Sequence, residues 1–371
     1  MDSGPGQGEK SRQDGLNGKR AASRRAADPA GTRRNQRADP ASDPLSDLLR
    51  AVHVRAAVFY YLSCRDTWSA EAPPAAEIAQ AVLPGCDHVS EFHMIAKGGG
   101  WAVVAGEPPL RLRTGDVVMF PHGDSHVLSS APGIRPIRRS AEWVFASRDA
   151  PRPIPVAYHD GVVQPGARLP LEQASMIAVC GFLGCDLQPF NPLLGALPRM
   201  LHLPAAQAAH WLPHVLDQAV DESRRARPGA NAVLERMAEM MFVDAARRHL
   251  ATLPEDATGW LAALRDRFVG KALCLLHARV DHAWSVDELA REVGLSRSAL
   301  HQRFTRLLGQ GPAQYLAAWR MQLGASMLRD SARPVCGIAQ EVGYASEAAF
   351  SRAFKRRLGM PPAAWRRSRT P

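Results

Sequence analysis

The feature that most constrains the fold is a pattern near the C-terminal end that occurs twice. Four positions of the first copy recur 49 residues later: Leu289, Ala290, Val293 and Gly294 match Ile338, Ala339, Val342 and Gly343. Six further positions recur 50 residues later: Ser296, Phe304, Arg306, Leu308, Gly309 and Pro312 match Ser346, Phe354, Arg356, Leu358, Gly359 and Pro362. The change of offset predicts a turn that is one residue longer in the second copy.

Each repeated residue type has a mechanical role in a helix–turn–helix motif. The alanine is small enough for one helix to cross close to the next, and the glycine can adopt the positive φ that ends a helix sharply. The serine is a favourable N-cap for the following helix, which the phenylalanine would anchor in a core. The repeat therefore predicts two helix–turn–helix motifs, at about residues 286–308 and 335–358, each with one exposed helix face.

One helix is expected between the two motifs. Within Pro312–Leu328, large apolar residues recur at every fourth position, the spacing of one helix face: Tyr315, Trp319, Leu323 and Met327. A rigid connector would fix the distance between two recognition helices. Such helices can enter successive major-groove segments about 34 Å apart, which predicts a bipartite site on double-stranded DNA.

The positive charge of the chain is concentrated in the same block. Residues 261–371 carry 18 basic and 8 acidic side chains, an excess equal to the net charge of +10 of all 371 residues. Residues 44–260 carry 19 basic and 22 acidic side chains. So basic a surface attracts a polyanion, and nucleic acid is the first candidate. A solvated face that only aids solubility is the alternative.

Residues 342–356, which read Val-Gly-Tyr-Ala-Ser-Glu-Ala-Ala-Phe-Ser-Arg-Ala-Phe-Lys-Arg, resemble the signature of AraC/XylS-type transcription regulators, as does Gly359-Met360-Pro361-Pro362. The resemblance covers about residues 265–368. It implies an all-α DNA-binding domain, here residues 265–371, in a sequence-specific transcription regulator. It also implies activation through RNA polymerase.

Carried over by position, the resemblance assigns the exposed faces of the two recognition helices. On the first helix these are Ser298, His301 and Gln302, and on the second they are Glu347, Ala348, Ser351 and Arg352. Arg352 can pair with O6 and N7 of guanine, and Gln302 can bond adenine in the same bidentate way. Six further cations are expected to contact phosphate or to be solvated surface charge: Arg297, Arg303, Arg306, Lys355, Arg356 and Arg357.

The N-terminal part of the chain has a different character. Residues 1–43 have only Met1 and Leu16 as large aliphatic or aromatic residues, so we expect a disordered basic tail, or a translation start placed too far upstream. Residues 44–200 contain a short helix near Leu48 and then short apolar runs separated by turns, which predict a small β-barrel or sandwich. The expected strands are 58–62, 92–96, 101–104, 117–120 and 176–182.

Residues 115–126 resemble the second motif of cupins: glycine, five residues, proline, one residue, glycine, two residues, histidine. That resemblance implies a cupin-like sensor domain over 44–200, with His126 pointing into the barrel. Of the two histidines and the glutamate that normally complete a cupin metal site, only His93 stands near the expected place. Three or four ligands are needed, so no metal cofactor is expected. The alternative for His93 and His126 is a hydrogen-bonded pair that lines or closes a pocket.

Residues 201–264 are expected to form a helical connector. Within residues 232–250, Leu234, Met237, Met241 and Ala245 form one apolar stripe. A second helix is expected where Leu261, Leu264, Phe268, Ala272 and Leu275 continue such a stripe. These helices either close the core of the barrel or form the contact of a homodimer.

The layout resembles AraC-type regulators with a cupin sensor, a group that includes the reactive-chlorine-responsive activators. That resemblance makes Cys64 and Cys180 the candidate redox pair of the sensor. Arg65 could lower the pKa of the Cys64 thiol and favour the reactive thiolate. The alternative is that both thiols are small buried core residues, because unpaired cysteines are usually buried.

Several classes are excluded. No apolar run approaches the roughly 18 residues of a membrane helix, and residues 1–43 lack the apolar stretch of a signal peptide. Six cysteines in a chain this long are not a secreted disulfide framework. We therefore expect an α+β multidomain regulator in the cytoplasm, not an enzyme, that responds to a small molecule or oxidant. The competing hypotheses are a metal-dependent cupin enzyme with an attached DNA-binding domain, and a non-specific nucleic-acid-binding protein.

Overall fold

The computed structural model describes residues 42–138, 141–147, 149–159, 161–207, 211–225 and 227–369. Capping and turn residues near each helix and strand set where these elements begin and end. The expected tail over residues 1–43 lies almost wholly outside the described residues. The chain enters the fold at Asp43, whose carboxylate accepts from the backbone N–H groups of Leu45 and Ser46 and so caps helix α1 (Pro44–Ala51).

Two sheets form the N-terminal part, as the short apolar runs predict. The seven-stranded sheet has the order β10-β9-β1-β11-β3-β6-β12, and the five-stranded sheet has the order β5-β4-β7-β2-β8. The strands are β1 (Arg55–Arg65), β2 (Ser69–Ala72), β3 (His88–Lys97), β4 (Gly99–Val104), β5 (Leu110–Arg113), β6 (Val117–Phe120), β7 (His126–Ser129), β8 (Ile137–Arg138), β9 (Ile154–His159), β10 (Val162–Pro165), β11 (Met176–Cys185) and β12 (Leu201–Leu203). Every residue of β11 is buried, because this strand lies at the centre of its sheet.

One hydrophobic cluster fills the space between the two sheets. It joins Phe59 and Phe182 of the seven-stranded sheet to Ala102 and Leu128 of the five-stranded sheet. Two short helices, α2 (Ala75–Val82) and α3 (Ala141–Ala146), lie in the connections between strands. The sandwich extends slightly beyond residue 200, because β12 pairs antiparallel with β6.

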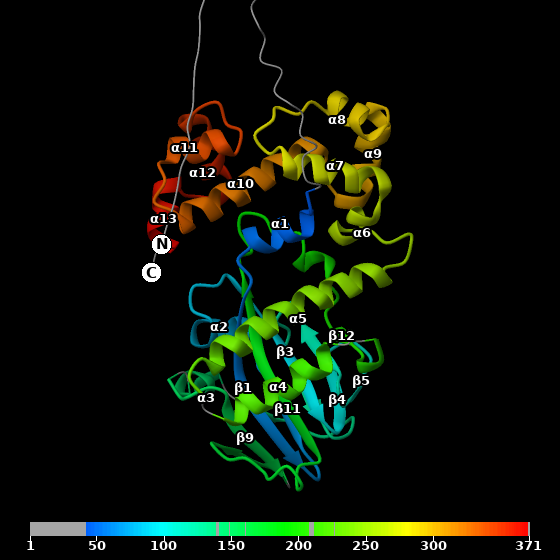
Figure 1. Ribbon diagram of the computed structural model, residues 1–371, viewed down its shortest axis with the longest axis vertical. Coiled ribbons are helices and arrows are strands. Elements are labelled where there is room, and N and C mark those ends of the chain that lie inside the picture. The colour runs from blue at the N-terminus through cyan, green and yellow to red at the C-terminus, as the bar shows by residue number, and fades with distance from the viewer. Residues whose placement is uncertain are drawn as a thin grey trace, which may run out of the picture. The chain divides into compact units, whose positions relative to one another are not determined.

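Helices α4 (Leu212–Arg224) and α5 (Ala230–Thr252) cover one face of the seven-stranded sheet (Figure 1). Leu234 and Met241 of α5 belong to a buried cluster that includes Val58 and Tyr61 of β1. The stripe expected over residues 232–250 is therefore confirmed as a helix, and that helix closes a core of the sandwich. Two 3₁₀ turns complete this part, Leu194–Ala196 and Ala205–Gln207.

The single helix expected through Leu261 and Leu275 is wrong. Helix α6 (Trp260–Arg265) ends one residue before Asp266, and α7 (Arg267–Ala278) begins one residue after it. The Asp266 carboxylate accepts from the backbone N–H groups of Phe268 and Val269, so it is the N-cap of a new helix. The apolar stripe persists across the break because both helices pack on the same core.

The C-terminal helices confirm two helix–turn–helix motifs. They are α8 (Val286–Val293) with α9 (Arg297–Leu308), and α11 (Val335–Glu341) with α12 (Glu347–Leu358), and the second turn is the longer, as expected. Helix α10 (Pro312–Asp330) joins the motifs, and α13 (Pro362–Arg369) follows them (Figure 1). None of the helices in the described part of the chain has the length and apolarity to cross a membrane.

The two motifs differ in what they pack against. The buried cluster beneath α5 continues through α1, α6 and α7 to Leu300 and Phe304 of the first motif. The second motif has its own cluster, which contains Phe350 and Phe354. The first motif therefore shares a core with the N-terminal part, and the second is attached chiefly through α10.

Candidate DNA-reading face and sensor cavity

The first recognition helix, α9, is fixed by its cap and by its anchor. The Ser296 hydroxyl accepts from the backbone N–H of Ala299 at 3.2 Å, and Phe304 is fully buried on the opposite side. This geometry leaves five of the sequence-predicted residues exposed: Arg297, Ser298, His301, Gln302 and Arg306. They form a polar, basic face whose side chains can reach a DNA groove.

The second recognition helix, α12, repeats the arrangement. The Ser346 hydroxyl accepts from the backbone N–H of Ala349 at 3.2 Å, and Phe350 and Phe354 are fully buried. Four of the predicted residues are exposed: Glu347, Ala348, Arg352 and Lys355. Ser351 is half-buried, so it can support a contact only from the edge of this face.

Two of the cations expected at phosphate or as solvated surface charge have partners within the protein. The Arg303 guanidinium donates to the Asp266 carboxylate at 2.7 Å and lies 5.2 Å from the centre of the Phe268 ring. The Arg357 guanidinium donates to the backbone carbonyl of Pro189 at 3.3 Å. A charge pattern in the sequence does not show which groups fold against each cation.

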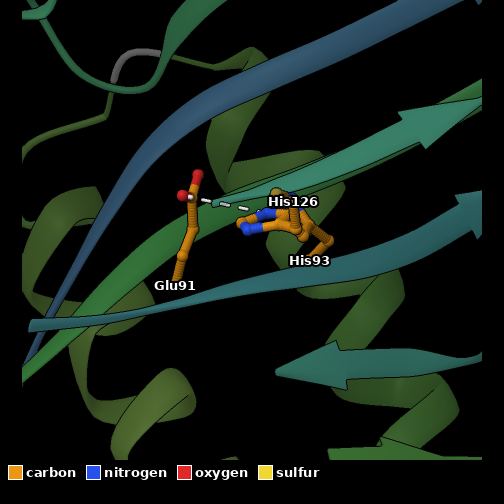
Figure 2. Close-up of side chains that lie close together, drawn as sticks. All are labelled: Glu91, His93 and His126. Carbon is orange, nitrogen blue, oxygen red and sulfur yellow. Dashed lines mark hydrogen bonds and ion pairs between the residues drawn. The ribbon is translucent and has the colours of Figure 1, made fainter. Parts of the chain in front are cut away.

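The second site lies between the two sheets, where Glu91, His93 and His126 meet. Glu91 and His93 are two residues apart on β3, so both side chains lie on the same face of that strand. His126 begins β7 in the opposite sheet. Figure 2 shows the Glu91 carboxylate directed at the two rings, which come from β3 and β7. All three residues are buried.

The distances within this cluster are short. His93 Nε2 lies 2.7 Å from His126 Nε2, and His126 Nε2 lies 3.8 Å from a carboxylate oxygen of Glu91. The metal-ligating atoms of the three side chains all lie within 4.8 Å of one another. Within the described residues, these three side chains form a group that is close enough together to hold a metal ion. Both histidines are predicted from the sequence and Glu91 is not, although the i, i+2 spacing of Glu91 from His93 is a usable signal.

The surroundings of His126 fix its protonation. Its Nδ1–H donates to the backbone carbonyl of Asp124 at 3.0 Å, because a carbonyl oxygen can only accept. The ring stacks on Phe120, with centroids 3.6 Å apart. Burial lowers the pKa of His126 to about 4, so the ring is neutral near pH 7 and its Nε2 lone pair faces the cavity.

A cavity of about 30 Å³ opens beside the cluster. At about 15 Å³ for each water, it holds two water molecules or one ion with a water. Besides the cluster, its lining includes Tyr60, Glu71 and Cys180. Any molecule bound there without rearrangement is therefore very small.

The strand register places Cys64 and Cys180, the candidate redox pair, apart from each other. Cys180 of β11 pairs with Tyr60 of β1, whereas Cys64 pairs with Met176. Four residues along a strand separate the two positions by about 13 Å, and a disulfide requires Cα atoms about 4.4–6.8 Å apart. Both thiols are buried, and Arg65 pairs with Asp66 at 2.9 Å. This register therefore does not bring the two thiols together for a direct disulfide, while Cys180 lies in the cavity wall.

Comparisons with known proteins identify the families of the two parts of the chain. The Cupin family matches residues 43–251, and a helix-turn-helix domain family matches residues 289–368. An AraC-like transcription regulator of Streptomyces antibioticus is 32% identical over 334 residues, which are 89% of this chain and 100% of that protein. The chain belongs to the AraC-like transcription regulators. This AraC-like regulator thus binds DNA through its helix-turn-helix domain and carries a cupin-like domain before it.

Other relatives have more specific names. The RCS-specific HTH-type transcriptional activator RclR of Escherichia coli is 30% identical over 199 residues, 53% of this regulator and 69% of RclR. Among solved structures, the DNA-binding domain of AdpA in complex with a target DNA is 27% identical and covers 28% of this regulator and 93% of that chain, with a TM-score of 0.27. The full-length relatives are named as regulators, which favours a non-enzymatic role.

Proposed function

We propose that this regulator reads a bipartite promoter site with α9 and α12, and that an effector in the cupin-like cavity controls this binding. The observation that carries the proposal is the exposure of the same helix face in both motifs, joined by the single helix α10. Two equivalent faces on one rigid connector suit two successive major-groove segments. The effector would be a small molecule or an oxidant.

Base contacts are assigned to the side chains that have bidentate geometry. Arg352 projects from α12 and suits guanine, and Gln302 projects from α9 and suits adenine. Arg297, Arg306 and Lys355 are assigned to phosphate, because cations around the recognition face position a motif without reading sequence. The remaining assigned contacts are Ser298, His301, Glu347, Ala348 and Ser351.

Three further assignments complete the proposal. The activator name of RclR supports activation through RNA polymerase. Val233 and Met240 lie two turns apart on one face of α5 and are 42% and 46% exposed, which supports that helix as a homodimer contact. A regulator that binds chromosomal DNA acts in the cytoplasm.

A footprint on the DNA beside the regulator's own gene tests whether the regulator binds DNA sequence-specifically. The expected result is a protected bipartite site of roughly two helical turns. Arg352→Ala should weaken binding by about 1–3 kcal/mol and remove base preference in one half-site. Arg113→Ala is the matched control, because Arg113 is an exposed arginine of β5, outside both motifs and the proposed dimer contact. Equal binding of specific and random DNA across salt concentrations would contradict the proposal.

A metal-dependent enzyme is the competing function, and the cluster of Glu91, His93 and His126 is the observation in its favour. Such an enzyme needs room for a substrate beside its metal. The cavity of about 30 Å³ has room for about two water molecules, so the same cluster fits a sensor better than it fits catalysis.

A further inference from the structure

We propose that residues 186–190, a segment of the cupin-like domain, determine which spacing between the two half-sites this regulator accepts. The 186–190 segment follows strand β11 and reads Asp-Leu-Gln-Pro-Phe. This assignment rests on the proposed function, since α9 and α12 are the helices that read the two half-sites. It places a determinant of DNA specificity outside the helix-turn-helix domain.

The two halves of connector α10 belong to different cores. Tyr315 and Trp319, in its first half, lie in the buried cluster that the first motif shares with the N-terminal part. Met321 and Leu328, farther along, lie in the cluster of the second motif, together with Phe350. The first half of α10 is therefore fixed to the first motif, and the second half is fixed to the second motif.

Gly324 lies where these two halves meet. A Cβ at this position would lie 2.9 Å from the ring of Phe350, so the close packing of the second motif on α10 requires glycine there. Glycine weakens the interior of a helix, and sharp kinks occur at glycine and serine residues. Ser326 follows two residues later. Gly324 is therefore the point at which the connector between the recognition helices bends most easily.

The 186–190 segment contacts α10 on both sides of this glycine. Before it, the buried Gln322 amide accepts from the backbone N–H of Phe190 at 2.9 Å and donates to the backbone carbonyl of Ala51 at 2.7 Å. After it, Nη1 of Arg329 donates to the carboxylate of Asp186 at 2.9 Å. A bend of α10 at the glycine would therefore break at least one of these bonds.

A third contact comes from the second recognition helix itself. Arg357, in the last turn of α12, donates through Nε and Nη2 to the backbone carbonyl of Pro189, both at 3.3 Å. Since α12 is a separate helix from α10, this contact resists rotation of the second motif about the axis of the connector. The contacts of Gln322, Arg329 and Arg357 together fix both the bend of α10 and that rotation.

Such a fixed arrangement makes the spacing between half-sites matter. One added base pair moves the second half-site by about 3.4 Å along the DNA and rotates it by about 35° around the helix axis. A second motif that is held by three polar contacts does not follow this displacement, whereas one held by α10 alone can follow it by bending at Gly324. The 186–190 segment therefore acts on specificity through the placement of α12 and not through a base contact.

A series of DNA sites with altered spacers tests the proposal. The affinity of the full chain is measured for the footprinted site and for versions with one or two base pairs added or removed between the half-sites. The wild type should bind the altered sites about 10-fold more weakly or worse. Gln322→Met keeps the length of the side chain and removes both hydrogen bonds, so it should reduce this penalty to about threefold or less.

Arg357→Ala should also reduce the penalty, because it removes the contact with Pro189. Arg356→Ala is the matched control, since Arg356 is the neighbouring exposed cation of α12. This control should change the affinity for every spacer by the same factor and leave the penalty as in the wild type. DNA that carries only the first half-site should be bound equally by the wild type and Gln322→Met, because the core of α9 is unchanged.

Circular dichroism and thermal melts identify any variant that does not fold. Folded Gln322→Met and Arg357→Ala proteins with the spacer penalty of the wild type would overturn the proposal. If Gln322→Met does not fold, the comparison of Arg357→Ala with Arg356→Ala decides.

The result for the wild type separates this proposal from the proposed function. Equal binding of all spacers, with both half-sites still protected, would overturn the role of the 186–190 segment and leave sequence-specific DNA binding intact. The absence of any protected bipartite site would remove the proposed function itself, and the spacing role with it.

Discussion

Asp186 and Arg329 connect the end of strand β11 to the helix between the two DNA-binding motifs. Nη1 of Arg329 donates to Oδ1 of Asp186 at 2.9 Å, and Nη2 lies 2.8 Å from Oδ2. His53 lies on the other side, with Nδ1 3.1 Å from Asp186 and Nε2 2.6 Å from Asp330. Asp186 itself is 6% exposed, so this carboxylate depends on its cationic partners.

Arg329→Met should therefore destabilise the protein strongly. The substitution leaves a buried carboxylate without its main counter-charge, and breaking such a pair costs about 3 kcal/mol. The free energy of unfolding from urea denaturation measures the effect. Arg333→Met is the control, because Arg333 pairs with Glu341 on the exposed surface and its loss should change stability little. Equal effects of the two substitutions would contradict the role assigned to Asp186.

The turn glycines of the two motifs should respond differently to alanine. Gly294 and Gly343 have φ of +83° and +80°, so either change places an L residue in the left-handed region at a cost of about 1 kcal/mol. At Gly343 a Cβ would also lie 2.6 Å from Nη2 of Arg320 and 2.8 Å from Cα of Asp281, whereas at Gly294 it would meet nothing within 4 Å.

Gly343→Ala should consequently lower the melting temperature more than Gly294→Ala does. Parallel thermal melts of the two variants make the comparison. Indistinguishable melting temperatures would mean that Arg320 and the backbone at Asp281 yield to the new methyl group without cost.

Alanine substitutions of Arg303 and Arg306 should have different effects, the first on stability and the second on DNA binding. Arg303→Ala removes the partner of Asp266, the N-cap of α7, and should lower stability by about 1 kcal/mol, since the guanidinium is partly exposed and screened. Arg306→Ala should leave stability unchanged. It should reduce by about 1 the salt slope of DNA binding, which is the slope of the logarithm of the binding constant against the logarithm of the salt concentration. Denaturation and salt-dependent binding of both variants test this. A reduced salt slope in Arg303→Ala would place that cation on DNA after all.

Stability should fall on acidification because of His126. Its pKa is about 4 in the folded protein and 6.5 when unfolded, so between these values the unfolded chain binds a proton that the folded protein excludes. Stability is thus full above pH 6.5 and is lost as the pH falls toward 4. The loss from pH 7 to pH 5 is about 2 kcal/mol. Burial also lowers the pKa of His277, which adds a loss of the same sign.

Urea denaturation at pH 7 and pH 5 measures this loss. His126→Gln should have a shallower pH dependence than the wild type, because glutamine does not titrate. A difference between the two pH values that is unchanged in the variant would show that His126 is protonated with an ordinary pKa in the folded state.

The helix–turn–helix motifs were predictable from sequence because their signals are local. A serine cap, a phenylalanine eight residues later and a glycine at the turn each act within one or two helical turns. Strand existence was predictable for the same reason, since apolar runs and turn residues are neighbours in sequence. The break at Asp266 was missed because the apolar stripe continues through it, and only the bonds to Phe268 and Val269 reveal a cap.

The sequence by itself determined two exposed recognition helices, their connector and the basic character of that domain, because caps, periodicity and composition act over short distances. The tertiary structure alone decided which distant residues meet. It placed Glu91 beside His93 and His126, separated Cys64 from Cys180 by four positions of strand register, and made Gly294 and Gly343 unequal. These outcomes depend on the pairing of strands and the packing of helices, which bring together side chains that no local pattern connects.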